Sequence, residues 1–176
     1  SERLGHASYR AAMQAESVDQ FRDRMQEAVE NYRNAKEFYG RLGEAGKTPR
    51  VLRCDAMIAY VSYWLTSELL EKKRLITECW RLTKESLKAF EEAGEALEYG
   101  KAYNQLSMSA IFGATRESNF QARERAVREA VEHGEKAIGF LSTLKDSYEL
   151  ARAYAQAASY LKVFAFNFLD LKEREG

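Results

Sequence analysis

The chain has 176 residues, 45% of them hydrophobic, and equal numbers of basic and acidic residues, 27 of each. This length suits one cooperative domain, so we expect residues 1–176 to form a single unit. A net charge of zero without a basic stripe argues against nucleic acid as a partner. No apolar run reaches the ~20 residues of a membrane span. With no signal peptide in the first residues, we expect a cytoplasmic protein.

Apolar residues recur at three- and four-residue spacing almost throughout the chain, and the strict alternation of a strand is absent. A single proline leaves long stretches in which nothing interrupts a helix. The sequence therefore predicts an all-α protein of about seven helices. In chain order they cover residues 1–15, 17–43, 48–66, 68–93, 97–115, 118–143 and 146–172.

Several helix boundaries carry chemical markers. Ser17 with Gln20, and Ser118 with Gln121, have the spacing of a capping box, in which a hydroxyl and an amide side chain satisfy backbone amides of the first turn. Each pair predicts the start of a helix. Gly94 predicts the end of another, because glycine readily adopts the left-handed conformation that closes a helix.

The chain repeats its pattern of side-chain size with a period of 51 residues. Two helices approach closely only where side chains are small, while large neighbours fill the grooves beside them. A helical pair repeated in this way buries its faces only by stacking on the next pair. The aligned small residues are Ala28, Cys79 and Ala130 in one set, and Ala56, Ser107 and Ala158 in another.

These residues resemble the tetratricopeptide repeat, which places Leu-Gly on its first helix and Ala-x-x-x-Phe on its second. Leu4-Gly5 and Leu106-Ser107 occupy the Leu-Gly position, and Ala28-x-x-x-Tyr32 is similar to the second element. The resemblance covers the whole chain. It implies a right-handed stack of antiparallel helical hairpins, a TPR-like α-solenoid.

The sequence departs from that family in its period, which is usually about 34 residues. The longer period leaves room for extra helical turns, and the segment 134–153 looks more like the longer-repeat branch found in signalling ATPases and transcription regulators. An ordinary helical bundle with accidental similarity is the competing interpretation.

The residues that commonly carry chemistry form no recognisable motif. His6 and His133 belong neither to a His pair four residues apart nor to a repeated Glu-x-x-His. Cys54 and Cys79 lie in helical patterns rather than in a CxxC, which predicts buried thiols in a reducing compartment. No phosphate-binding loop or nucleophile motif occurs. We therefore expect no metal, no cofactor and no enzymatic activity.

In the family that the chain resembles, the first helices of successive pairs line a concave groove that holds a peptide or a partner helix. The resemblance implies a function as a protein-interaction scaffold. Aromatic residues, Met and Arg are enriched where binding energy concentrates, although packing between extended helices explains the aromatics equally well. The candidate partner-binding residues are Arg53, Met57, Tyr60, Trp64, Asn104, Met108 and Ile111.

Two other functions are compatible with the sequence. A ligand-sensing helical domain of a multi-domain regulator is one, and a metal- or cofactor-binding bundle enzyme is the other.

The C-terminal helix carries too many apolar residues for a lone solvated helix. It predicts either a homodimer contact or the continuation of a larger protein. The apolar residues of this helix that we expect to form the contact are Phe164, Phe166, Phe168, Leu169 and Leu171.

Overall fold

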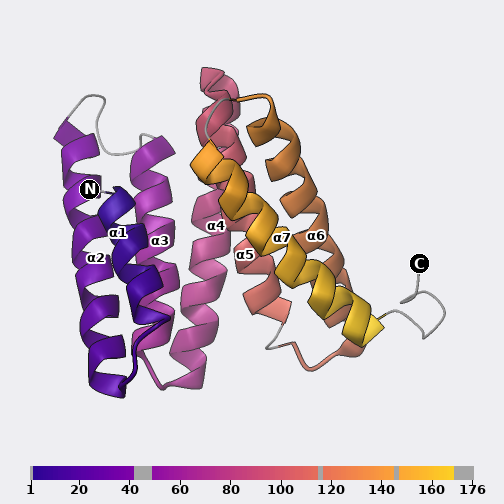
Figure 1. Cartoon of the computed structure of the whole chain (residues 1–176), viewed down its shortest axis with the longest axis horizontal. Coiled ribbons are helices and arrows are strands. Elements are labelled where there is room, and N and C mark those ends of the chain that lie inside the picture. Colours follow the sequence, from indigo (N-terminus) through magenta and orange to yellow (C-terminus); the bar gives the residue numbers. More distant parts are fainter. Residues whose placement is uncertain (1, 42–48, 115–116, 145–146, 169–176) are drawn as a thin grey trace. The chain divides into compact units, whose positions relative to one another are not determined.

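The computed structural model describes residues 2–41, 49–114, 117–144 and 147–168, with side chains at all of these except 147, 160 and 163–168 (Figure 1). This part of the chain is all-α, as predicted. Helices pack in sequence as antiparallel neighbours. The seven described helices are α1 (Glu2–Ala12), α2 (Val18–Arg41), α3 (Pro49–Leu65), α4 (Leu69–Ala93), α5 (Ala96–Ala114), α6 (Phe120–Ser142) and α7 (Ser147–Phe168). No helix in the described ranges is long and apolar enough to cross a membrane.

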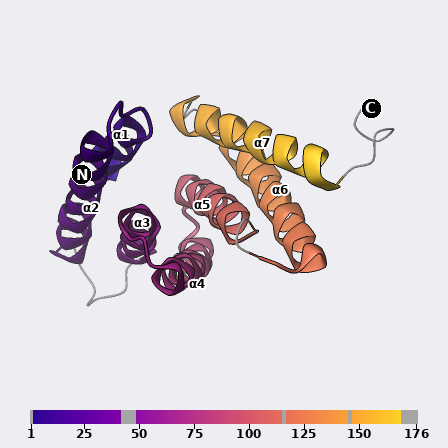
Figure 2. The ribbon, with the colours of Figure 1, turned by 90° about the horizontal axis from the view of Figure 1, so that it is seen from below.

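The chain forms two compact units, Ser1–Ala89 and Phe90–Gly176, and each is described by itself. In the first unit α2 packs against both α1 and α3 (Figure 2). The α3–α4 pair of this unit is joined by the Ser86 hydroxyl, which donates to the Pro49 carbonyl at 2.8 Å. In the second unit α6 packs against both α5 and α7. Whether the whole chain folds as one domain stays a prediction.

Small residues allow the close helix contacts in both units. In the first, Gly5 of α1 lies so near the ring of Tyr32 in α2 that a Cβ at Gly5 would be 2.9 Å from three ring carbons. In the second, a Cβ at Gly134 of α6 would lie 3.2 Å from the Ser107 hydroxyl of α5. The Ser107 hydroxyl donates to the Ala130 carbonyl in the same contact. Small residues thus lie at both of these close contacts between helices.

Two of the predicted helix boundaries are confirmed. Ser17 Oγ accepts a hydrogen bond from the Gln20 amide at 3.2 Å, and the Gln20 side chain accepts one from the Glu16 amide, also at 3.2 Å. The α4 helix ends before Gly94, which has a φ of 68°. There the Gly94 amide donates to the Glu91 carbonyl and the Glu95 amide to the Phe90 carbonyl, the two bonds of a Schellman motif.

The prediction of a capping box at Ser118 and Gln121 was wrong by one residue. Asn119 caps α6, and its side-chain oxygen accepts a hydrogen bond from the Ala122 amide at 2.9 Å. Asn is at least as good a capping residue as Ser. Asn119 therefore takes the position that the Ser-x-x-Gln spacing had assigned to Ser118.

The contact at Gly5 predicts opposite effects for two glycine-to-alanine substitutions in the first unit. We expect Gly5→Ala to lower the free energy of unfolding by about 1–2 kcal/mol, because the new methyl group overlaps the buried Tyr32 ring. Gly40→Ala should raise it by up to about 1 kcal/mol, since Gly40 lies in α2 with open space around it. Urea unfolding of both variants tests this. Equal effects at the two sites would contradict the close α1–α2 contact.

Candidate functional site

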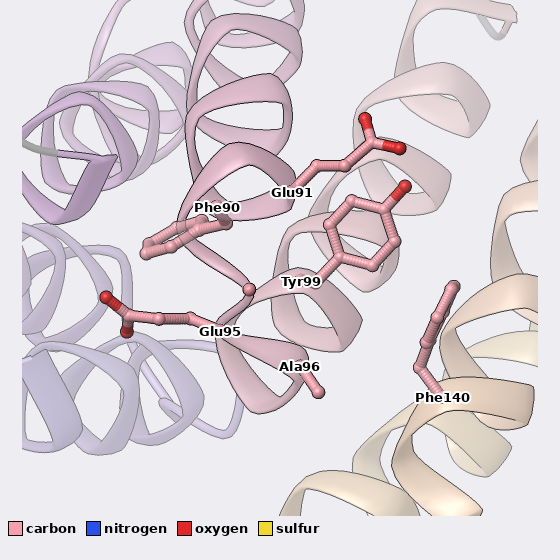
Figure 3. Close-up of a pocket in the computed structure, with 7 residues that line it drawn as sticks. Phe90, Glu91, Glu95, Ala96, Tyr99 and Phe140 are labelled. Atoms are coloured by element: carbon pink, nitrogen blue, oxygen red, sulfur yellow. The ribbon is translucent and has the colours of Figure 1, made fainter.

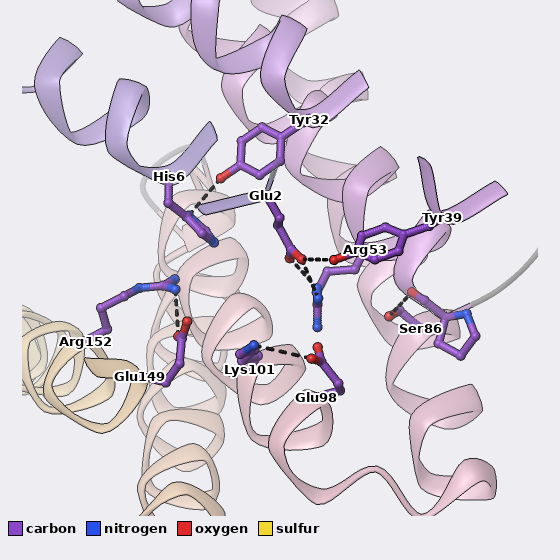
Figure 4. A network of polar contacts seen from close by, with 11 residues as sticks. Glu2, His6, Tyr32, Tyr39, Arg53, Ser86, Glu98, Lys101, Glu149 and Arg152 are labelled. Carbon is purple, nitrogen blue, oxygen red and sulfur yellow. Dashed lines mark hydrogen bonds and ion pairs between the residues drawn. The ribbon is translucent and has the colours of Figure 1, made fainter. Parts of the chain in front are cut away.

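Arg53, the first of the predicted partner-binding residues, is held inside the first unit (Figure 4). Its Nε and one terminal nitrogen donate to the two carboxylate oxygens of Glu2 in α1, each at 2.7 Å. Tyr39 of α2 donates to the same carboxylate at 3.2 Å. Only 3% of the Arg53 side chain is exposed. Arg53 therefore links α3 to α1 directly, and the shared Glu2 carboxylate links both to α2.

Met57, Tyr60 and Trp64 lie along α3 in the same unit. Met57 and Tyr60 are buried, and the Tyr60 and Tyr9 hydroxyls are hydrogen bonded at 2.8 Å. Trp64 is half-buried, with its ring edge-to-face against Tyr60 and against Phe21 of α2. This arrangement favours the alternative interpretation, in which the aromatics pack between helices.

The predicted residues of the second unit are Asn104, Met108 and Ile111 of α5, and all three are buried. The Gln156 amide of α7 donates to the Met108 sulfur at 3.7 Å. Contact between a partner and these side chains, or Arg53, would require the surrounding packing to open. The assignment of the seven residues to partner binding stays a prediction.

Asn104 stands out because neither atom of its buried amide group has a hydrogen-bond partner among the described residues. The side-chain oxygen of Gln156 in α7 is also buried and has no hydrogen-bond partner among the described residues. A buried polar group without a partner costs about 1–3 kcal/mol, the desolvation penalty of the group. The buried amide groups of Asn104 and Gln156 therefore lower the stability of the second unit.

We expect Asn104→Leu to raise the free energy of unfolding by about 1 kcal/mol, because leucine has the same branched shape and no amide to desolvate. Chemical denaturation of the purified chain measures the change. Asn104→Asp is the paired variant and should be strongly destabilising, since it buries a charge. A loss of stability in Asn104→Leu would show that the amide has a partner in solution.

His133 of α6 is a half-buried titratable group at the contact with α5. It lies 3.6 Å from the Glu129 carboxylate and against the ring of Tyr103. Burial lowers the pKa of His133, and the positive charge of Lys136 lowers it further. The negative charge of Glu129 raises this pKa but does not cancel the effect of burial. The imidazole is therefore held in its neutral form by its surroundings.

This lowered pKa predicts a pH-dependent contribution to stability. The ordinary pKa of histidine is about 6.5, so the unfolded chain takes up the proton before the folded one does. The contribution is present above that value and is lost as the pH falls through the lower folded pKa. We expect His133→Gln to lose less stability than the wild type between pH 7 and pH 5 in urea unfolding. Parallel losses would contradict the burial of the imidazole.

The described residues offer little for metal or covalent chemistry. Within these ranges no group of three or more His, Cys, Asp and Glu residues is placed to hold a metal ion. Cys54 and Cys79 are buried free thiols, as predicted. Burial raises the pKa of Cys54 to about 12, so this thiol is protonated at neutral pH and is a poor nucleophile.

The last helix, α7, has a covered side and an open side. On the covered side Ala153 is buried with Ala137 and Leu141 of α6, and Leu150 packs against this cluster. Arg152 of α7 donates to the buried Glu149 carboxylate at 2.7 Å, within the same helix (Figure 4). The covered side thus anchors α7 to α6.

The open side of α7 carries an exposed row of apolar residues at three- and four-residue spacing. Tyr154 is 55% exposed and Leu161 47%. Exposed apolar rows of this kind mark interaction surfaces, because single scattered residues are the norm elsewhere. The row, named the α7 stripe below, consists of Ala151, Tyr154, Ala155, Ala158 and Leu161.

The sequence pattern singled out no individual residue of this surface for partner binding. The alignment at 51 residues contained Ala158, but the periodicity of a helix does not say which of its faces a neighbour covers. The residues expected to form the dimer contact lie outside the described side chains. They are Phe164, Phe166, Phe168, Leu169 and Leu171.

The chain matches no protein-family model, no curated protein and no solved structure with which it was compared. The fold itself defines the class: an all-α protein whose helices pack in sequence as antiparallel neighbours.

Proposed function

We propose that this chain is a protein-interaction scaffold of tetratricopeptide-like repeats, and that its α7 stripe binds a helix of another polypeptide. One observation carries the proposal: the α7 stripe is exposed, whereas α6 covers Gly100, Tyr103 and Ser107, three of the corresponding residues of α5. The scaffold needs no cofactor and catalyses no reaction. The partner surface that we propose is thus the outer side of α7 rather than the buried residues of α3 and α5.

The correspondence between α7 and α5 rests on the proposed period. Residues that lie 51 positions before Ala151, Tyr154, Ala158 and Leu161 are Gly100, Tyr103, Ser107 and Ala110. In both helices the order is small, Tyr, small and apolar. In α5, Leu141 lies over Gly100, Phe140 stacks on Tyr103 at 5.7 Å, and Ser107 bonds the Ala130 carbonyl. The α7 stripe has the same kind of side chains, exposed.

Contacts in the first unit support a 51-residue period. Arg53 bonds Glu2 and Tyr60 bonds Tyr9, and the two partners are 51 residues apart in each case. Such contacts are expected when equivalent positions of successive first helices face one another in a stack. The helices after α1, which has 11 residues, run from 17 residues in α3 to 25 in α4, and these lengths support the longer-repeat branch of the family.

The chemistry of the partner follows from the helix that covers α5. The side of α6 that faces the core has small residues at four- and three-residue spacing, followed by one large apolar residue. They are Ala130, Gly134, Ala137 and Leu141, all buried. The partner helix that fits the α7 stripe is antiparallel to α7 and carries a similar series, which lets the two backbones approach closely.

A second copy of this chain is the other candidate for the same surface. The exposure of Tyr154 and Leu161 favours it, because these side chains would be covered in a homodimer formed through the C-terminal helix.

A peptide that copies α6 tests the proposal. We expect a fluorescein-labelled peptide of residues 119–143 to bind the full chain saturably in fluorescence anisotropy. Ala158→Gln should weaken binding by about tenfold, because a longer side chain at the small position holds the helices apart. Ser159→Gln is the matched control, since Ser159 is exposed on α7 and lies outside the stripe.

Equal weakening by both variants, or no binding to a chain shown to be folded by circular dichroism, would count against the helix-binding surface. Light scattering of the same three proteins separates the second copy from another partner. A dimer that Ala158→Gln alone dissociates assigns the stripe to self-association.

A further inference from the structure

A pocket of about 300 Å³ lies in the second unit, where α4 turns into α5. The Schellman motif at Gly94 makes this turn, with its positive φ of 68°. The turn brings the end of α4 beside the first turn of α5, and Phe140 of α6 completes the lining. Helix ends and a tight turn thus form the pocket.

Two aromatic rings form a corner of this pocket (Figure 3). The centroids of Tyr99 and Phe140 are 4.7 Å apart, and the ring planes are inclined by 85°. Tyr103 supports both rings from outside the pocket: it is edge-to-face with Tyr99 and stacks on Phe140. Phe140 is nevertheless 37% exposed, which is unusual for a ring held by two others.

A carboxylate stands beside this corner. Figure 3 shows the Glu91 side chain extending toward the Tyr99 hydroxyl, while Glu95 points to the other side of the turn. Burial raises the pKa of Tyr99, and hydrogen bonding to Tyr103 and the nearby negative charge of Glu91 raise it further. The described lining contains no Lys or Arg. No basic residue of the described lining offsets the Glu91 charge, and Lys136 lies outside the lining, with its Nζ 5.8 Å from the Tyr103 ring centroid.

We propose that this pocket binds a primary ammonium or guanidinium group, with its aliphatic stem against Phe140 and its charge between the Tyr99 ring and the Glu91 carboxylate. A cation is attracted to the face of an aromatic ring within about 6 Å of its centroid. The Glu91 carboxylate adds a charge-assisted hydrogen bond. A basic side chain of a peptide and a free amine offer the same chemistry.

Other ligand classes fit less well. An anion would be repelled by Glu91. A hard metal ion prefers about six oxygen ligands, which one carboxylate and two rings do not supply. The chain itself pairs ammonium groups with rings elsewhere: Lys84 Nζ is 4.5 Å from the Trp80 ring centroid, and Lys72 Nζ is 5.3 Å from that of Tyr63.

Amide NMR spectra of the full chain test the site, with Gly94 and Ala96 as reporters in its wall. The probe for a free amine is n-butylammonium, compared with uncharged 1-butanol. The probe for a side chain is Ac-Gly-Lys-Gly-NH2, compared with its norleucine analogue. We expect saturable shifts with both charged probes and weaker ones with the neutral probes. A response to only one charged probe identifies the source of the cation.

Three variants decide which groups act. Glu91→Gln should weaken binding of the charged probes by about two- to fivefold, the range of an exposed ion pair. Phe140→Leu should weaken binding of the charged probes by a similar factor, because the ring is lost. The amide spectrum of this variant shows whether it is folded. Glu135→Gln removes the same charge from an exposed position of α6 outside the lining and should leave binding unchanged.

Equal binding of charged and neutral probes would overturn the proposal, as would equal weakening by Glu91→Gln and Glu135→Gln. Neither result bears on the α7 stripe, which is tested with a different probe and different variants.

Discussion

The close approach of helices at small residues is the constraint on which the rest of this structure depends. Where α5 meets α6, the Ser107 hydroxyl donates to the Ala130 carbonyl, and Gly134 leaves room for that hydroxyl. A backbone carbonyl is reachable by a side chain as short as serine only when two helices are nearly in contact. The large residues on either side, Tyr103 and Leu141, can then fill the grooves that remain.

The same constraint makes buried polar contacts informative. Glu2 and Arg53 form a bidentate ion pair in the interior of the first unit, where desolvation cancels much of the attraction. Such a pair adds little net stability, but a shift of α1 along α3 would break both of its hydrogen bonds. We infer that its main effect is on register. The uncompensated amide of Asn104 has no comparable structural account.

Short-range sequence patterns predict the ends of helices more directly than they predict which helix faces are exposed. Helices and their ends follow from short-range patterns, as the Ser17 cap and the Gly94 turn show. The competition between Ser118 and Asn119 for one cap shows the limit of such patterns. The spacing of Arg53, Met57 and Tyr60 correctly places them on one face of α3. It does not reveal whether that face meets solvent, because α3 is apolar on several sides and most of it is buried.

Helices α5 and α7 differ in how far similar surfaces are covered. The two helices present similar rows of small and aromatic residues, yet Ala110 is 6% exposed and Leu161, 51 residues later, is 47% exposed. Apolar side chains gain about 25 cal/mol for each Å² removed from water. A row that is covered in one helix and open in another is therefore a surface whose burial would be favourable. The small residues of the row permit the close approach of another helix.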